Sequence, residues 1–109
     1  MAYVDTFTSP EPTRAEIDAL AEPVLIEFGT AWCPHCQAAQ APLETALDSV
    51  RGLRHVKVED GPGRRLGRSF RIKLWPTLVL CVAGHELGRV VRPTEVAAIR
   101  ALFEQLPGA

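Results

Sequence analysis

The sequence predicts a single α/β domain in which a mixed β-sheet is flanked by helices on both faces. Short apolar runs typical of buried strands alternate with stretches whose apolar residues recur at helical spacing. Two of the runs are separated only by a turn-forming stretch, which predicts an antiparallel hairpin. The chain has 109 residues, 47% of them hydrophobic, which is enough for one ordinary core. Residues 1–109 are therefore expected to form one domain.

The first half of the chain is expected to contain a weak strand, a short helix, a strand and a longer helix, in that order. Thr13 and Glu16 form a capping-box pattern, which predicts the start of the short helix. Residues 24–28 are apolar except at Glu27, as expected for a central strand that is covered on both faces. A helical pattern follows from residue 33 to about residue 50.

The second half is expected to add three strands and two helices. Residues 53–58 alternate in part and predict a strand, and residues 64–70 predict a short helix. Residues 77–82 and 87–91 predict the two strands of the hairpin, joined by Ala83-Gly84-His85-Glu86. Pro93 suits the start of the last helix.

Two of the three cysteines lie in the segment Trp32-Cys33-Pro34-His35-Cys36, after an apolar run and before a helical pattern. In a short chain without secretory features, this placement is typical of a redox-active dithiol rather than of a structural disulfide. A thiolate at a helix N-terminus is stabilised by free backbone N–H groups and the helix dipole, which lowers its pKa. The spacing allows the second sulfur to attack a mixed disulfide formed by the first.

Four features, in this order, resemble the thioredoxin family over about residues 6–106. They are the strand that leads into Cys33-x-x-Cys36, the acidic Glu27 six residues before Cys33, Lys57 on the next strand, and Trp75-Pro76-Thr77 at the position of the family's cis-proline loop. The resemblance implies the thioredoxin fold and a thiol–disulfide oxidoreductase, with a Cys33–Cys36 redox disulfide and no separate cofactor.

The same resemblance assigns roles to the residues around the dithiol. It implies that Cys33 is the exposed nucleophile and Cys36 the buried resolving thiol. It also implies that Pro76 is cis and that the backbone of Trp75 pairs with a bound substrate strand. Trp32 is expected beside them, on the rim of the apolar patch around Cys33.

Glu27 and Lys57 are expected to act together below the dithiol. By resemblance, Glu27 accepts the proton of Cys36 through water, with Lys57 nearby. A carboxylate without a partner in an apolar strand is costly, so an unpaired Glu27 should have a raised pKa. The alternative interpretation is that Glu27 and Lys57 form a plain buried ion pair.

The pair between the cysteines departs from the thioredoxin pattern. Pro34-His35 is the pair of the DsbA-type thiol oxidases, and the resemblance places both residues at the substrate-binding surface. A histidine beside the thiolate stabilises the reduced form, which makes the disulfide a stronger oxidant. Three further departures, Gly29, Pro42 and Arg92-Pro93, lie near the expected docking surface. Pro42 lies one residue later than the family's helix proline, and a kink is expected there.

The functional interpretation that the resemblance favours is a cytoplasmic protein-disulfide reductase that works as a monomer with a partner reductase. No signal peptide is expected, and no run approaches the ~18 apolar residues that span a membrane. In a reducing cytosol, net reduction is expected despite the Pro34-His35 pair. One alternative is a thioredoxin-fold binding module in which the dithiol is not catalytic. A metal site is not expected in one chain, since a single C-x-x-C lacks the second ligand pair, although a site shared between two chains stays open.

Charge is distributed unevenly along the chain. Residues 1–50 carry eight acidic side chains and one basic one, whereas residues 51–73 carry eight basic and two acidic ones. Arg64, Arg68 and Arg71 fall on one side of a predicted helix. Phe70 is the one aromatic within this basic block, so no nucleic-acid partner is expected. The block is either a solvated helix face or a positive rim that steers acidic partners.

Three remaining residues are expected to be structural or solvent-exposed. Cys81 lies within an apolar strand, where a free cysteine packs as a small hydrophobic residue. His55 and His85 have no nearby cysteine or carboxylate pattern, so both are expected at the surface.

Overall fold

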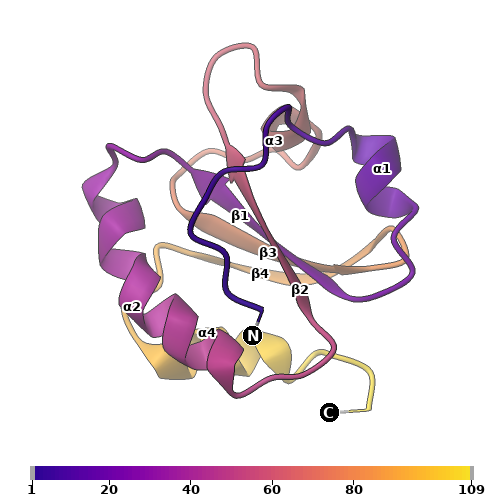
Figure 1. The fold of residues 1–109 in the computed structure, drawn as a ribbon, viewed down its shortest axis with the longest axis vertical. Coiled ribbons are helices and arrows are strands. Elements are labelled where there is room, and N and C mark those ends of the chain that lie inside the picture. The colour runs from indigo at the N-terminus through magenta and orange to yellow at the C-terminus, as the bar shows by residue number, and fades with distance from the viewer. Residues whose placement is uncertain (1, 109) are drawn as a thin grey trace.

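The computed structural model describes residues 2–108 and confirms a mixed sheet covered by helices on both faces (Figure 1). The strands are β1 (Val24–Gly29), β2 (Arg54–Glu59), β3 (Thr77–Val82) and β4 (His85–Val91). They lie side by side in the order β2-β1-β3-β4. β1 is parallel to β2 and antiparallel to β3, and β3 is antiparallel to β4. A parallel pair needs a long crossover, which a helix between β1 and β2 supplies.

Two helices cover each face of the sheet (Figure 1). α2 (Pro34–Asp48) and α4 (Val96–Phe103) pack on one face, and α1 (Arg14–Asp18) and α3 (Arg65–Ser69) pack on the other. The α2 helix runs through Pro42 without interruption. Within residues 2–108, no helix combines the length and the apolar character needed to cross a membrane.

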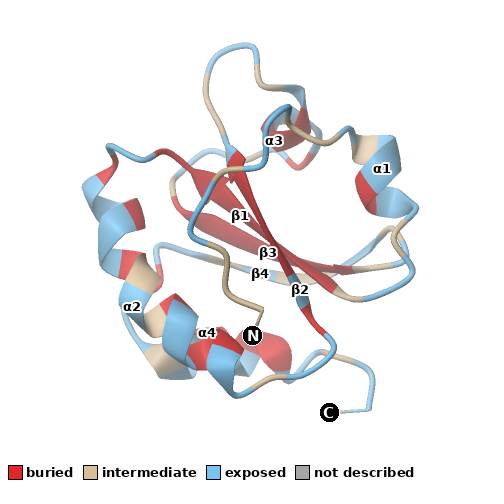
Figure 2. Ribbon diagram, viewed as in Figure 1, coloured by how far each residue is buried: buried red, intermediate tan, exposed pale blue. Residues whose placement is uncertain are grey.

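The central strand β1 is buried along its whole length (Figure 2). Ile26 and Phe28 pack in the apolar cluster under α1 and α3, whereas Leu25 packs in the cluster under α2 and α4. Because side chains alternate along a strand, Glu27 points to the same side as Leu25. The fold therefore places a carboxylate inside the layer between the sheet and α2.

The helix starts agree with the sequence signals, with one shift. Thr13 caps α1 and forms the predicted capping box with Glu16. The last helix begins at Val96, with Glu95 as its N-cap, rather than directly at Pro93. Pro93 is buried three residues earlier, in the segment that joins β4 to α4.

The predicted weak strand near the N-terminus is wrong. The segment before α1 runs along β2 but forms no strand within residues 2–13 (Figure 1). The Thr8 N–H donates to the Lys57 carbonyl at 2.8 Å, as a strand would. The Val4 N–H instead donates to the side chain of His55, and Pro10 has no N–H to offer. A regular ladder therefore does not form.

Leu43 offers a direct test of the packing of α2 on the sheet. Its side chain is fully buried, so Leu43→Ala should lower the free energy of unfolding by about 2–5 kcal/mol, through lost apolar burial and the cavity left behind. Thr45→Ala, at an exposed position of the same helix, should change it by no more than about 0.5 kcal/mol. Urea unfolding measures both, and equal losses would contradict the described packing.

Candidate redox site

The dithiol lies where β1 ends and α2 begins. Cys33 is the N-cap of α2, and its Sγ accepts a hydrogen bond from the Cys36 N–H at 3.3 Å. Pro34 occupies the first turn, where its missing N–H costs the helix nothing. The Cys33 thiol also lies 3.9 Å from the Trp75 carbonyl oxygen. All three cysteines of the chain are free thiols.

The expectation that Cys33 is exposed and Cys36 buried is wrong for Cys33. The two residues are 5% and 4% exposed, respectively. Cys33 is covered because its sulfur folds back onto the start of α2 and lies against the Trp75 carbonyl. The two residues therefore have nearly the same solvent exposure, and their thiols differ in their surroundings.

The two thiols have opposite acidities. Burial alone would raise the pKa of Cys33, but hydrogen bonds from the Cys36 thiol and from the Cys36 and His35 N–H groups, with the charge of Arg92, hold it below the ordinary value. Burial raises the pKa of Cys36 to about 12, and the hydrogen bond to Cys33 adds to this rise. Because the thiolate is the nucleophile, Cys33 is the more reactive sulfur.

The loop before β3 forms the other side of the site. The Trp75–Pro76 peptide bond is cis, as the resemblance implied. Trp32 is 69% exposed, and its ring meets that of Trp75 edge-on, with 5.8 Å between the ring centroids. The Trp75 indole N–H donates to Asp60 at 2.8 Å. The two tryptophans thus lie beside Cys33, as predicted.

Gly29 packs directly against the Cys36 sulfur. A Cβ atom at this position would lie 2.5 Å from the Cys36 Sγ, which is closer than real Cβ atoms come to other heavy atoms. A side chain at position 29 would therefore displace the Cys36 thiol. The absence of a side chain at Gly29, which departs from the thioredoxin pattern, therefore leaves the space that the Cys36 thiol occupies.

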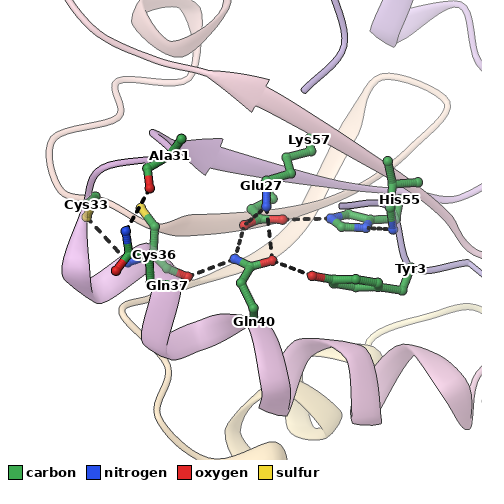
Figure 3. Close-up of polar contacts among 10 residues, drawn as sticks. Tyr3, Glu27, Ala31, Cys33, Cys36, Gln37, Gln40, His55 and Lys57 are labelled. Atoms are coloured by element: carbon green, nitrogen blue, oxygen red, sulfur yellow. Dashed lines mark hydrogen bonds and ion pairs between the residues drawn. The ribbon is translucent and has the colours of Figure 1, made fainter. Parts of the chain in front are cut away.

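The carboxylate of Glu27 is the centre of a buried polar network (Figure 3). The Gln40 side-chain amide donates to Glu27 Oε2 and to the Cys36 carbonyl, each at 2.8 Å. The Lys57 ammonium lies 3.6 Å from Glu27 Oε2 and donates to Gln40 Oε1 at 3.0 Å. The Tyr3 hydroxyl donates to the same Gln40 oxygen at 2.7 Å. Gln40 thereby links the carboxylate to the backbone of the resolving cysteine.

The expected rise in the pKa of Glu27 does not occur, because the carboxylate is not unpaired. Burial acts to raise the pKa, since Glu27 is only 2% exposed. Hydrogen bonds from His55 and Gln40 and the charge of Lys57 outweigh burial, and the pKa falls below its ordinary value. Glu27 and Lys57 therefore form an ion pair, but as two members of a larger network.

The prediction that His55 lies at the surface is wrong, since it is 4% exposed. His55 and Lys57 point to the same side of β2, because they are two residues apart on a strand. The His55 Nε2 lies 2.9 Å from Glu27 Oε1, and its Nδ1 accepts the Val4 N–H at 2.8 Å. Since Nδ1 accepts, Nε2 carries the hydrogen, so a neutral imidazole donates to the carboxylate.

Comparison with known proteins identifies the family. The family model described as "Thioredoxin" matches residues 6–105. The chain belongs to the thioredoxin family. Members of this family are thiol–disulfide oxidoreductases, and the chain carries the C-x-x-C pair at the start of α2. The domain is therefore a thiol–disulfide oxidoreductase with a thioredoxin fold.

Named relatives agree with this assignment. A thioredoxin from Mycobacterium bovis is 30% identical over 79% of this chain and 76% of its own length. Thioredoxin H2-1 from rice (Oryza sativa subsp. japonica) is 28% identical over 62% of this chain, which spans about half (49%) of that protein. The structure of thioredoxin 2 from Pseudomonas aeruginosa PAO1 in its reduced form has a TM-score of 0.80 and 52% identity, and covers 90% of this chain and 91% of its own.

Other singled-out residues lie around or away from this thioredoxin site. His35 is exposed at the start of α2, next to the Cys33 sulfur. His85 is exposed, as predicted, at the start of β4. Cys81 is buried, as predicted, and burial raises its pKa to about 11. In the described residues, 2–108, no group of three or more His, Cys, Asp or Glu side chains is placed to hold a metal ion.

Sequence reasoning missed His55 and Gln40 as partners of Glu27, and Tyr3 as a partner of Gln40. The signal for His55 was present, because a residue two positions before Lys57 shares its side of the strand. Gln40 lies one helical turn after Cys36 and could have been found from that spacing. Tyr3 could not, because it reaches Gln40 from a segment that follows no regular pattern.

The ionisation of Glu27 makes a testable contribution to stability. A pKa lowered in the folded state stabilises the protein above the ordinary value of 4.5, and this contribution is lost as the pH falls through that region. The difference in unfolding free energy between wild type and Glu27→Gln should therefore shrink as the pH is lowered from 7 to about 3. Urea unfolding at a series of pH values measures it.

Glu44→Gln is the matched control, because Glu44 is an exposed acid of α2 without an ion pair to residues 2–108. Its difference from wild type should change much less over the same pH range. A difference for Glu27→Gln that instead grows on acidification would mean that Glu27 is protonated in the folded protein, contrary to the described network.

Proposed function

We propose that this thioredoxin domain reduces disulfides in protein substrates in the cytoplasm. The carrying observation is the asymmetric dithiol, in which Cys33 caps α2 beside the cis-proline loop while the Cys36 thiol is held in its protonated form. Such a pair attacks through one sulfur and resolves through the other. The exposed face of Trp32 beside Cys33 offers an apolar contact for a substrate chain.

The first step is attack by the Cys33 thiolate on a substrate disulfide. The new bond joins Cys33 Sγ to one substrate sulfur, and the substrate S–S bond breaks. The second substrate sulfur leaves as a thiolate and takes a proton from solvent. The Trp75 backbone, next to Cys33, is the proposed partner of the substrate strand, and Pro76, Pro34 and His35 border that strand.

The second step is attack by Cys36 on the mixed disulfide. Once Cys33 is bonded to substrate, it no longer carries the charge and hydrogen bond that raise the pKa of Cys36. The remaining obstacles are burial and the negative charge of Glu27, and the proton of Cys36 passes through water to the Glu27 carboxylate, which Lys57 and Gln40 contact. The Cys36 thiolate then bonds to Cys33 as the bond between Cys33 and the substrate sulfur breaks. The released substrate sulfur leaves as a thiolate and takes a proton from solvent, so the substrate leaves as a dithiol, and Glu27 returns its proton to solvent.

Each cycle moves two electrons from the protein dithiol to the substrate and leaves a Cys33–Cys36 disulfide. A partner reductase must return those two electrons before the next cycle. No further cofactor is required in the domain, and we propose that it works as a monomer. The Pro34-His35 pair favours the reduced dithiol, which makes it a weaker reductant. Net reduction of substrates therefore requires a donor that keeps nearly all of the domain in its dithiol form.

A binding module with an idle dithiol is the second candidate, and Arg92 favours it. The Arg92 Nε donates to the Trp75 carbonyl at 2.9 Å, so the group proposed to receive a substrate strand already has a partner. In the reductase, this guanidinium must move aside when substrate binds. In the binding module it stays, and a Cys33→Ser/Cys36→Ser protein keeps its cellular function.

Cysteine substitutions test the catalytic proposal. Cys33→Ser should lose insulin-reducing activity by at least about 100-fold, because the attacking thiolate is gone. Cys36→Ser should also fail to turn over but should accumulate a mixed disulfide with substrate, detectable by mass spectrometry. Cys81→Ser is the control, because Cys81 is buried away from the dithiol and should retain activity. Activity in Cys33→Ser would remove the reductase from consideration.

The reduction potential tests the direction of electron flow. Titration with glutathione, followed through Trp32 fluorescence, should give a value nearer to about −270 mV, as in thioredoxin, than to about −120 mV, as in DsbA. His35→Gly should shift the potential to more negative values, because the reduced form loses its stabilising neighbour. A wild-type value near the DsbA figure would reassign the domain as an oxidant.

A further inference from the structure

A basic hollow lies next to the dithiol on the side of α3. It has a volume of about 490 Å³ and is bordered by the loop after β2, by α3 and by the segment that leads to Trp75. Its cationic lining consists of Arg64, Arg68, Arg71 and Lys73. We call this surface the basic hollow. Three of these residues are the arginines that the sequence pattern placed on one side of the helix.

The charge of the basic hollow is largely uncompensated. Arg64 pairs with Glu59 at 2.8 Å, and Asp60 is engaged by the indole of Trp75. Arg68, Arg71 and Lys73 are exposed and form no ion pair with any residue in the range 2–108. Asp60 also lines the basic hollow, but the basic side chains outnumber it. A concave surface with an excess of one sign of charge attracts groups of opposite charge more strongly than a flat face does.

The basic hollow shares one residue with the reactive thiol. Trp75 borders the basic hollow, and its carbonyl lies 3.9 Å from the Cys33 sulfur. Arg92 donates to the same carbonyl at 2.9 Å. A substrate chain attacked by Cys33 therefore lies near Arg92 and near the tryptophan that borders the basic hollow.

The backbone conformations of two of these arginines support a role for them. Arg71 and Arg92 have φ angles of +56° and +51°, in the left-handed region that favours glycine. A residue with a side chain is less stable than glycine in that region. Both are next to the Trp75 loop, one in the basic hollow and one on its carbonyl. Arginine at positions 71 and 92 thus places a positive charge beside the Trp75 loop at some cost in stability.

We propose that the basic hollow and Arg92 bind acidic side chains that flank the disulfide of a protein substrate, so that the domain prefers acidic substrates. The inference rests on the proposed reductase function and names its substrate class. The chain has a net charge of −1, which gives it no general attraction for acidic molecules. A preference for acidic substrates therefore has to come from the basic hollow and Arg92. An RNA occupant is less favoured, because Trp75 is the one aromatic residue that lines the basic hollow.

Matched peptides test the proposal. Short peptides dimerised through one central cysteine and flanked by glutamates, glutamines or lysines are reduced by the wild-type dithiol, and the rate is followed by Trp32 fluorescence. The glutamate peptide should react about tenfold faster than the glutamine peptide at low salt, and the lysine peptide should react slowest. The ratio of the glutamate-peptide rate to the glutamine-peptide rate should approach one near 1 M salt, where charges are screened beyond ~3 Å.

Charge variants locate the effect. Arg68→Glu/Lys73→Glu should abolish the preference for the glutamate peptide. Arg51→Glu/Arg100→Glu changes the net charge equally at exposed positions outside the basic hollow, and should keep the ratio within about twofold. Arg71→Asn suits the left-handed backbone but removes the charge, so it should fold and lower the ratio, while Arg71→Lys should retain most of it.

The outcomes separate this inference from the function on which it rests. If all three peptides are reduced at one rate, the reductase stands and the basic hollow has no role in selection. If none is reduced, and Cys33→Ser behaves as wild type does, the reductase itself fails. The inference would be overturned if Arg68→Glu/Lys73→Glu and Arg51→Glu/Arg100→Glu lost the preference for the glutamate peptide to the same extent. Binding of a polyuridine RNA that depends on Arg68 and Lys73, without any charge order among the peptides, would also overturn it.

Discussion

The carboxylate of Glu27, buried beneath the dithiol, is the group on which the arrangement of this domain depends. A buried charge is tolerated only when hydrogen bonds and opposite charge replace its water. Here His55, Gln40 and Lys57 supply them from β2 and α2. Each partner is itself held by a further contact, so the strand, the helix and the N-terminal segment are joined through one side chain (Figure 3).

This network contacts Cys36 and does not contact Cys33. Gln40 bonds both the Glu27 carboxylate and the Cys36 carbonyl, so the start of α2 is anchored to the sheet at that point. Gly29 brings the β1 backbone against the Cys36 sulfur. Cys33 has its contacts with the helix N-terminus and the Trp75 loop instead. The two sulfurs are therefore positioned by different parts of the fold.

Most of the fold and the residues of the dithiol could be predicted from the sequence, because they depend on local signals. Apolar runs, the Thr13–Glu16 capping box and the C-x-x-C segment each act over a few residues. The N-terminal segment was mispredicted because its N–H groups are satisfied by a side chain, His55, and not by a strand. The low pKa of Glu27 could not be foreseen either, since two of its three partners, His55 and Gln40, were not recognised as such.

The hydrogen bond from the Val4 N–H to His55 makes the buried charge depend on the first residues of the chain. With that N–H in place, Nδ1 is occupied as an acceptor and the ring hydrogen stays on Nε2, facing Glu27. If proteolysis removed this segment, Nδ1 would lose its partner, and either ring nitrogen could carry the hydrogen. A ring with its hydrogen on Nδ1 would turn a bare Nε2 toward the Glu27 carboxylate, and that hydrogen bond would be lost. Trimming a few N-terminal residues would thus weaken the support of a buried charge, although no buried side chain had been altered.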